Sequence, residues 1–219
     1  MSNKHLLIVL LIFPIMVFSQ IEKDARLWTE VKLEKEVKDF TFNLGLAYRL
    51  DENFSHMDKA LAEIEVEYKI NKRWDIGIGY RYSRDNDYED FNYDLKPRFE
   101  IGAQYDNKIE WWNIDDLKFK YRVKYQIESA PINENNEAYV RNKFTLDYKK
   151  KDWSPFISWE FYYQFNNRMD FTRSRISGGL KYDITKNTAI EIFYILEDKF
   201  RTDRIEQDHI YGIGYSIEF

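Results

Sequence analysis

The chain has 219 residues, no cysteine and a formal net charge of −5. The absence of cysteine excludes disulfides, thiolate metal sites and acylation at a cysteine, and the mild, mixed charge offers no basic surface for nucleic acid. Aromatic residues make up 18% of the chain and charged residues 32%. So many of both coexist most easily on opposite faces of β-strands, as in a barrel in lipid.

Residues 1–19 have the features of a signal peptide. Lys4 gives a weakly basic start, an apolar run covers 6–18, and small residues precede a cleavage site after Ser19. The apolar run is too short to span hydrocarbon comfortably, so a membrane anchor is the less favoured alternative, and no such run recurs later. We expect residues 20–219 to form one mature domain.

Beyond the leader, the chain repeats one unit, an alternating apolar and polar run followed by a polar turn, which predicts an all-β protein. The runs cover residues 27–33, 40–50, 62–70, 74–82, 91–105, 117–127, 140–148, 157–165, 173–182, 190–197 and 211–219. Eleven runs are visible, whereas bacterial single-chain barrels have even strand numbers. We therefore expect ten or twelve strands, with either a strand merged or missed, most plausibly near 105–116, or a first run outside the wall.

The connections alternate in length. The short ones lie near 35–38, 71–72, 150–152 and 183–187, and the long polar ones near 51–59, 84–90, 129–137, 166–171 and 198–208. Short periplasmic turns and longer external loops are typical of outer-membrane barrels. Trp74, Trp111, Trp112 and Trp153 lie close to the short turns. Their position predicts an aromatic girdle at the membrane interface.

The last run alternates strictly. Tyr215, Ile217 and Phe219 project to one face, with small or polar residues on the other. This ending resembles the C-terminal signal of outer-membrane β-barrels, which the barrel insertion machinery reads. We therefore expect that machinery to be a partner of this chain.

The polar faces carry rows of charge that would point into the barrel. The predicted lumen-lining residues are Glu63, Glu65, Glu67, Arg98, Lys118, Lys120, Arg122, Lys124, Arg141, Lys143, Arg173 and Arg175. Long side chains would occupy much of a barrel of ten or twelve strands, and buried charges must pair or stay wet. We expect a salt-bridged lumen with at most a narrow water path, in which a basic stripe would favour anions.

No catalytic, cofactor or metal site is expected. An outer-membrane hydrolase is one alternative, with the pair Asp208–His209 and the carboxylates of Asp85 and Asp87 in external loops activating water. The pair Ser55–His56 offers half of a serine-esterase arrangement, without a recognisable nucleophile motif.

A soluble periplasmic β-barrel that binds a ligand is a second alternative, because periodicity does not determine which face of a strand lies inside. The terminal Phe219 and the tryptophan positions favour lipid outside.

Three segments carry a family resemblance: Leu27-Trp28-Thr29-Glu30-Val31, the stretch 68–75 (YKINKRWD) and the stretch 122–126 (RVKYQ). They resemble an uncharacterised family of Gram-negative outer-membrane proteins (domain of unknown function 2490). The resemblance implies architecture and location over the mature chain, and no activity.

These observations together predict a transmembrane antiparallel up-and-down β-barrel of 10–12 strands. It would lie in the outer membrane among lipids and lipopolysaccharide. We expect a non-enzymatic structural or binding barrel, or a narrow porin-like passage for small solutes.

Overall fold

The computed structural model describes residues 22–87, 92–111, 114–129, 136–166, 168–200 and 205–219. The strands are β1 (Glu22–Val37), β2 (Phe40–Asp51), β3 (His56–Lys69), β4 (Trp74–Asp87), β5 (Asn92–Leu95), β6 (Arg98–Trp111), β7 (Ile114–Glu128), β8 (Glu137–Tyr148), β9 (Trp153–Gln164), β10 (Asp170–Asp183), β11 (Thr188–Phe200) and β12 (Ile205–Glu218). Within these ranges, no helix has the length and apolar character needed to cross a membrane. The predicted leader, residues 1–19, lies outside the described residues.

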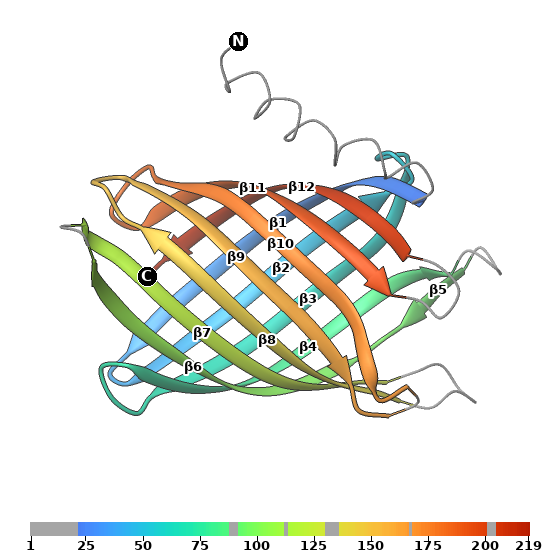
Figure 1. The fold of residues 1–219 in the computed structure, drawn as a ribbon, viewed down its shortest axis with the longest axis horizontal. Coiled ribbons are helices and arrows are strands. Elements are labelled where there is room, and N and C mark those ends of the chain that lie inside the picture. The colour runs from blue at the N-terminus through green and yellow to red at the C-terminus, as the bar shows by residue number, and fades with distance from the viewer. Residues whose placement is uncertain (1–21, 88–91, 112–113, 130–135, 167, 201–204) are drawn as a thin grey trace, which may run out of the picture.

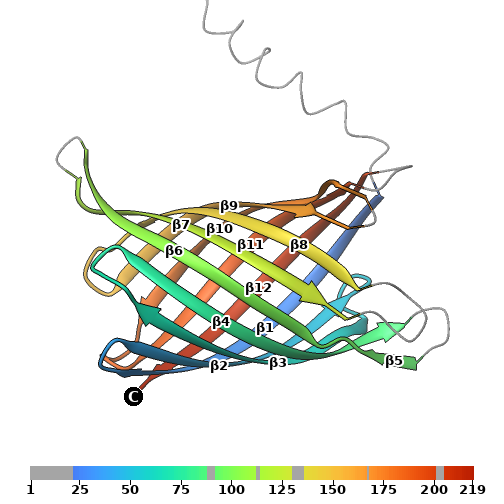
Figure 2. The same ribbon diagram turned by 90° about the horizontal axis from the view of Figure 1, so that it is seen from below.

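The strands form one closed barrel (Figures 1 and 2). β5 and β6 share one wall position, because both pair with β4 along its length. Pro97 separates them, and proline has no N–H to continue the ladder. The twelve strands therefore occupy eleven positions in the wall. The predicted barrel of 10–12 strands is confirmed.

The expectation of an even number of wall strands is wrong. β1 pairs with β12 in parallel, from Glu22 opposite Glu206 to Glu34 opposite Glu218, whereas the other neighbours are antiparallel. A ring of an odd number of alternating strands must contain one parallel pair, and the structure places it where the chain closes. Among the described residues, 105–111 belong to β6 and 114–116 to β7, so the additional strand does not lie there. The single run 91–105 instead contains β5 and the start of β6, and the first run is part of the wall.

The parallel seam puts the start of β1 and the end of β12 at opposite ends of the barrel (Figure 1). One end, the short-turn end, carries the connections at 38–39, 70–73, 149–152 and 184–187 and the C-terminus. The other, the loop end, carries the start of β1 and, among the described residues, the connections at 52–55 and 96–97. The strands run further toward the loop end than the sequence predicts. Asp85 and Asp208 belong to β4 and β12 rather than to loops.

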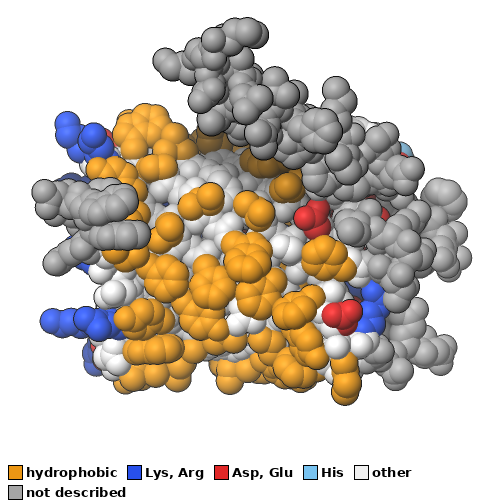
Figure 3. All heavy atoms as spheres, viewed as in Figure 1, with side chains coloured by type: hydrophobic (Ala, Val, Ile, Leu, Met, Phe, Trp, Pro, Cys, Tyr) orange, Lys and Arg blue, Asp and Glu red, His pale blue; other side chains and the backbone are white. Residues whose placement is uncertain are grey.

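The alternation places apolar side chains outside and charged side chains inside. The large apolar residues that alternate along each strand are exposed, for example Ile64, Ile157 and Ile192. Figure 3 shows hydrophobic side chains covering the wall, with lysine and arginine gathered toward one end. Glu100, Glu160 and other charged residues of the opposite face are buried. The apolar side of the strands therefore faces away from the barrel axis.

Candidate functional site

Two cavities lie in series inside the barrel. The central cavity has a volume of about 440 Å³ and is lined by residues from β1 through β11. The loop-side cavity has a volume of about 450 Å³ and reaches the strand ends at Asp51, Asn86 and Phe200. Eight residues line both cavities, and we call them the neck: Trp28, Arg49, Lys59, Glu128, Glu137, Tyr139, Arg173 and Arg175. The neck is thus the boundary that the two cavities share.

A continuous network of ion pairs runs along the inner wall from β3 to β11. Arg141 donates to Glu160 at 2.9 Å and lies 3.8 Å from Glu100. Lys124 joins Glu65 at 2.6 Å and Glu100 at 2.8 Å. Among the described residues, the network consists of Glu63, Glu65, Arg81, Arg98, Glu100, Lys124, Glu128, Arg141, Glu160, Arg173, Arg175 and Glu197. Buried charges are tolerated when each has an opposite partner, and this network provides the partners.

A small apolar cluster interrupts the charged lining where β11, β12 and β1 meet. Trp28, Ile195 and Ile210 form a buried cluster, and Phe193 packs against it. Phe193 lies across the backbone of β12 at Gly212, where a Cβ would stand 2.0 Å from the ring. Gly212 therefore leaves the space that this ring fills.

Three inward-facing cations have no acidic partner. Among the described residues, no carboxylate oxygen lies within 4.0 Å of the Arg49, Arg122 or Lys143 side chain. The central cavity as a whole is lined by ten basic and seven acidic side chains. This basic excess belongs to a chain whose net charge is −5. The lining of the central cavity is therefore more positive than the protein that encloses it.

Eight of the twelve charged residues that the sequence indicates line the central cavity: Glu63, Glu65, Arg98, Arg122, Arg141, Lys143, Arg173 and Arg175. Glu67 and Lys124 line a smaller hollow toward the short-turn end. Lys120 pairs with Asp147 at 2.7 Å, and neither it nor Lys118 reaches the two cavities. The acidic and basic rows do not pair rung by rung, because Glu63 is held by Arg81 of the adjacent strand.

Sequence reasoning did not assign several residues of this interior. Glu100, Glu160 and Glu197 carry the network, and they follow the same alternation as the residues that were assigned. Tyr162 lies beneath the Arg141, Arg173 and Arg175 guanidinium groups, with ring distances of 4.8–5.2 Å. Alternation could have found the three glutamates. It does not show which cations they meet, because that depends on the register between strands.

Two of the four girdle tryptophans are described. Trp74 and Trp153 begin β4 and β9 at the short-turn end, and both are exposed on the outer face. Each ring lies against a tyrosine of a neighbouring strand, with centroids 5.1 and 4.5 Å apart. The side chain of Trp111 and the whole of Trp112 lie outside the described residues.

The three residues of the expected insertion signal lie at the end of β12. Tyr215 and Ile217 belong to the strand, and Tyr215 is exposed. Phe219 follows the strand, is exposed, and donates its backbone N–H to the Glu34 carbonyl at 3.0 Å.

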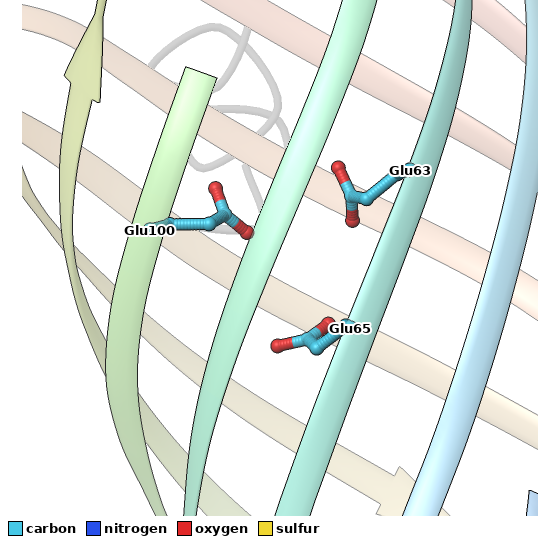
Figure 4. Close-up of side chains that lie close together, drawn as sticks. All are labelled: Glu63, Glu65 and Glu100. Atoms are coloured by element: carbon cyan, nitrogen blue, oxygen red, sulfur yellow. The ribbon is translucent and has the colours of Figure 1, made fainter. Parts of the chain in front are cut away.

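The carboxylates of Glu63, Glu65 and Glu100 converge inside the barrel (Figure 4), with oxygens within 4.8 Å of one another. Three acidic side chains at this spacing suggest a cation site. However, each already has a protein cation, Arg98 or Lys124 among them. A metal ion would have to displace these partners, so the arrangement is that of an ion-pair network.

The hydrolase arrangement is not formed. Asp208 points inward and pairs with Arg26 and Lys199 at 3.1 and 2.7 Å. His209, the next residue of the strand, points outward and contacts the Tyr194 hydroxyl at 2.6 Å. Neighbouring residues of a strand project to opposite faces, so these two groups cannot act on one water molecule.

The esterase arrangement fails in a different way. Ser55 Oγ and a Glu52 carboxylate oxygen both lie 2.9 Å from the same His56 ring nitrogen, Nδ1. A catalytic histidine uses one ring nitrogen for the nucleophile and the other for the acid. These contacts stabilise the turn between β2 and β3 instead.

Comparison with known proteins agrees with the fold. The NanC porin matches with a TM-score of 0.55 and 14% identity, covering 90% of this chain and 99% of that one. The β domain of the Bordetella autotransporter BrkA matches with a TM-score of 0.45 and 10% identity, covering 80% of this chain and 82% of that one. No curated protein matches the sequence. The model of the family described as protein of unknown function (DUF2490) matches residues 25–208, and the chain belongs to this family.

Proposed function

We propose that the protein is an integral outer-membrane barrel that provides a narrow passage for small solutes, with a preference for anions. The observation that carries the proposal is the pair of interior cavities joined at the neck, with ten basic and seven acidic side chains around the central one. Charged rings of this kind select ions by sign in membrane channels. No enzymatic activity is required of this interior.

The outer surface supports a location in lipid. Large apolar side chains are exposed on the strands around the barrel, including Ile64 and Ile192. A water-soluble protein rarely exposes so continuous an apolar surface, whereas an outer-membrane barrel turns such a band toward lipid. We propose outer-membrane lipids and lipopolysaccharide as its surroundings, export through residues 1–19, and insertion through the C-terminal signal. A soluble barrel with an apolar interior is not favoured by this arrangement.

A closed structural or binding barrel is the second candidate. The ion-pair network from β3 to β11 favours it, because paired side chains occupy much of the interior. The two candidates differ in whether ions cross the neck.

Conductance of the purified protein in planar bilayers tests the passage. We expect steady conductance and, in a salt gradient, a reversal potential that shows a preference for chloride over potassium. Combining Arg122→Gln with Lys143→Gln removes two unpaired cations and should reduce that preference. Lys120→Gln is the matched control, because Lys120 is paired and lies away from both cavities. Electrical silence of the folded protein would refute the passage in favour of a closed barrel.

A further inference from the structure

One basic residue of the neck stands without a counter-charge. Arg49 projects from β2, and its guanidinium carbon lies 3.7 Å from the centroid of the Trp28 ring. Its Nε is buried without a hydrogen-bond partner, and no carboxylate of the described residues lies within 4.0 Å of it.

The other neck cations each have a carboxylate partner. Lys59 pairs with Asp85 at 2.5 Å. Arg173 and Arg175 share Glu197. Among the described residues, Arg49 is therefore the neck cation that forms no ion pair.

An apolar cluster lies beside Arg49. Trp28, Phe193 and Ile195 all line the central cavity, with Ile210 buried next to them. The contact with Trp28 restricts the guanidinium group, which lowers the entropy lost when it binds a ligand. A fixed cation and an apolar surface thus meet at one point of the passage. Within the described part of the chain, the side chains of Arg122 and Lys143, the other unpaired cations, lie over no aromatic ring.

We propose that Arg49 and the apolar cluster of Trp28, Phe193 and Ile195 form a binding subsite for a small organic carboxylate with an apolar or aromatic body. The carboxylate takes the open donors of Arg49, a pairing that planar guanidinium groups favour. The apolar body packs on the adjacent cluster and is thereby removed from contact with water. An inorganic anion gains only the first contact, and a neutral apolar molecule only the second. The inference rests on the proposed function, because a solute would reach this subsite through the passage. It adds the chemical class of that solute.

Binding of benzoate to the purified, folded protein in detergent micelles tests the subsite, by equilibrium dialysis or calorimetry. We expect one benzoate per barrel, bound at least tenfold more tightly than acetate or benzamide. Arg49→Gln should weaken benzoate binding at least tenfold, and Arg49→Lys by an intermediate factor, because lysine keeps the charge without the planar donors. Lys120→Gln is the control, because Lys120 lines neither cavity, and it should leave benzoate binding unchanged.

A second variant separates the two halves of the site. Ile195→Ala should weaken benzoate binding and leave acetate binding unchanged, and heat-modifiable migration in gels shows which variants are folded. Failure of the wild-type protein to bind benzoate, equal binding of benzoate and acetate, or full benzoate binding by folded Arg49→Gln would each overturn the subsite. Benzoate binding by a protein that does not conduct would keep the subsite and overturn the passage. Conductance without benzoate binding would do the reverse.

Discussion

Replacing Glu160 with glutamine tests the energetic role of the interior network. Glu160 is buried and accepts hydrogen bonds from Arg141 at 2.9 and 3.2 Å, with Arg175 at 3.8 Å. Removing one partner of a buried ion pair costs about 3–5 kcal/mol. Here Arg141 would keep Glu100 at 3.8 Å and Arg175 would keep Glu197. We therefore expect a smaller loss, of about 2–3 kcal/mol, because neither arginine loses every partner.

Urea unfolding of the protein in lipid vesicles, followed by tryptophan fluorescence, measures this loss from the midpoint at constant slope. Glu191→Gln is the matched control. Glu191 lines the same cavity, and among the described residues no basic group lies within 4.0 Å of its carboxylate. It should change the free energy of unfolding by less than about 0.5 kcal/mol. Equal effects of the two substitutions would refute the view that specific pairs, rather than general lumen charge, stabilise the barrel.

Three further outcomes follow from the same structure. Gly212→Val should lower the free energy of unfolding by about 1–3 kcal/mol, because the valine side chain would clash with the Phe193 ring that lies over Gly212. Gly45→Ala, whose Cβ would make only ordinary contacts, should leave the free energy of unfolding unchanged. Equal effects of the two substitutions would contradict the close approach of Phe193 to Gly212. Ile64→Lys, on the exposed outer face, should lower the free energy of unfolding in lipid by about 2–4 kcal/mol, whereas Asn53→Lys in a turn should not. Equal tolerance of lysine at both positions would indicate that water, and not lipid, surrounds the barrel. Deleting Phe219 should reduce insertion in cells, measured by outer-membrane fractionation, and leave refolding into vesicles intact; normal insertion would contradict its role as a signal.

Much of the fold could be predicted from the sequence because each strand must separate an apolar face from a polar one. The run from Phe40 to Leu50 alternates strictly, and the structure has a strand there that exposes its apolar side. Where a strand no longer separates an apolar face from a polar one, alternation does not predict its extent. Near the loop end both faces become polar, so Asp85 and Asp208 were assigned to loops although strand pairing continues through them.

The interior contacts could not be predicted in the same way. Alternation already places Trp28 on the face that carries Glu30 and Lys32. It does not show that Arg49 covers the indole, because this depends on how β1 and β2 are aligned. The closing pair of strands is likewise a property of the whole ring, and no local pattern in either strand indicates its direction.

The parallel closure between β1 and β12 has a consequence for biogenesis. In a membrane-spanning ring with an even number of alternating strands, both ends of the polypeptide stay in the compartment from which it arrived. Here the start of β1 and the end of β12 lie at opposite ends of the ring, so the start of β1 must reach the far side of the bilayer before the ring can seal. Two different epitope tags, one fused ahead of β1 and one after β12, would accordingly be accessible to antibodies from opposite sides of the membrane.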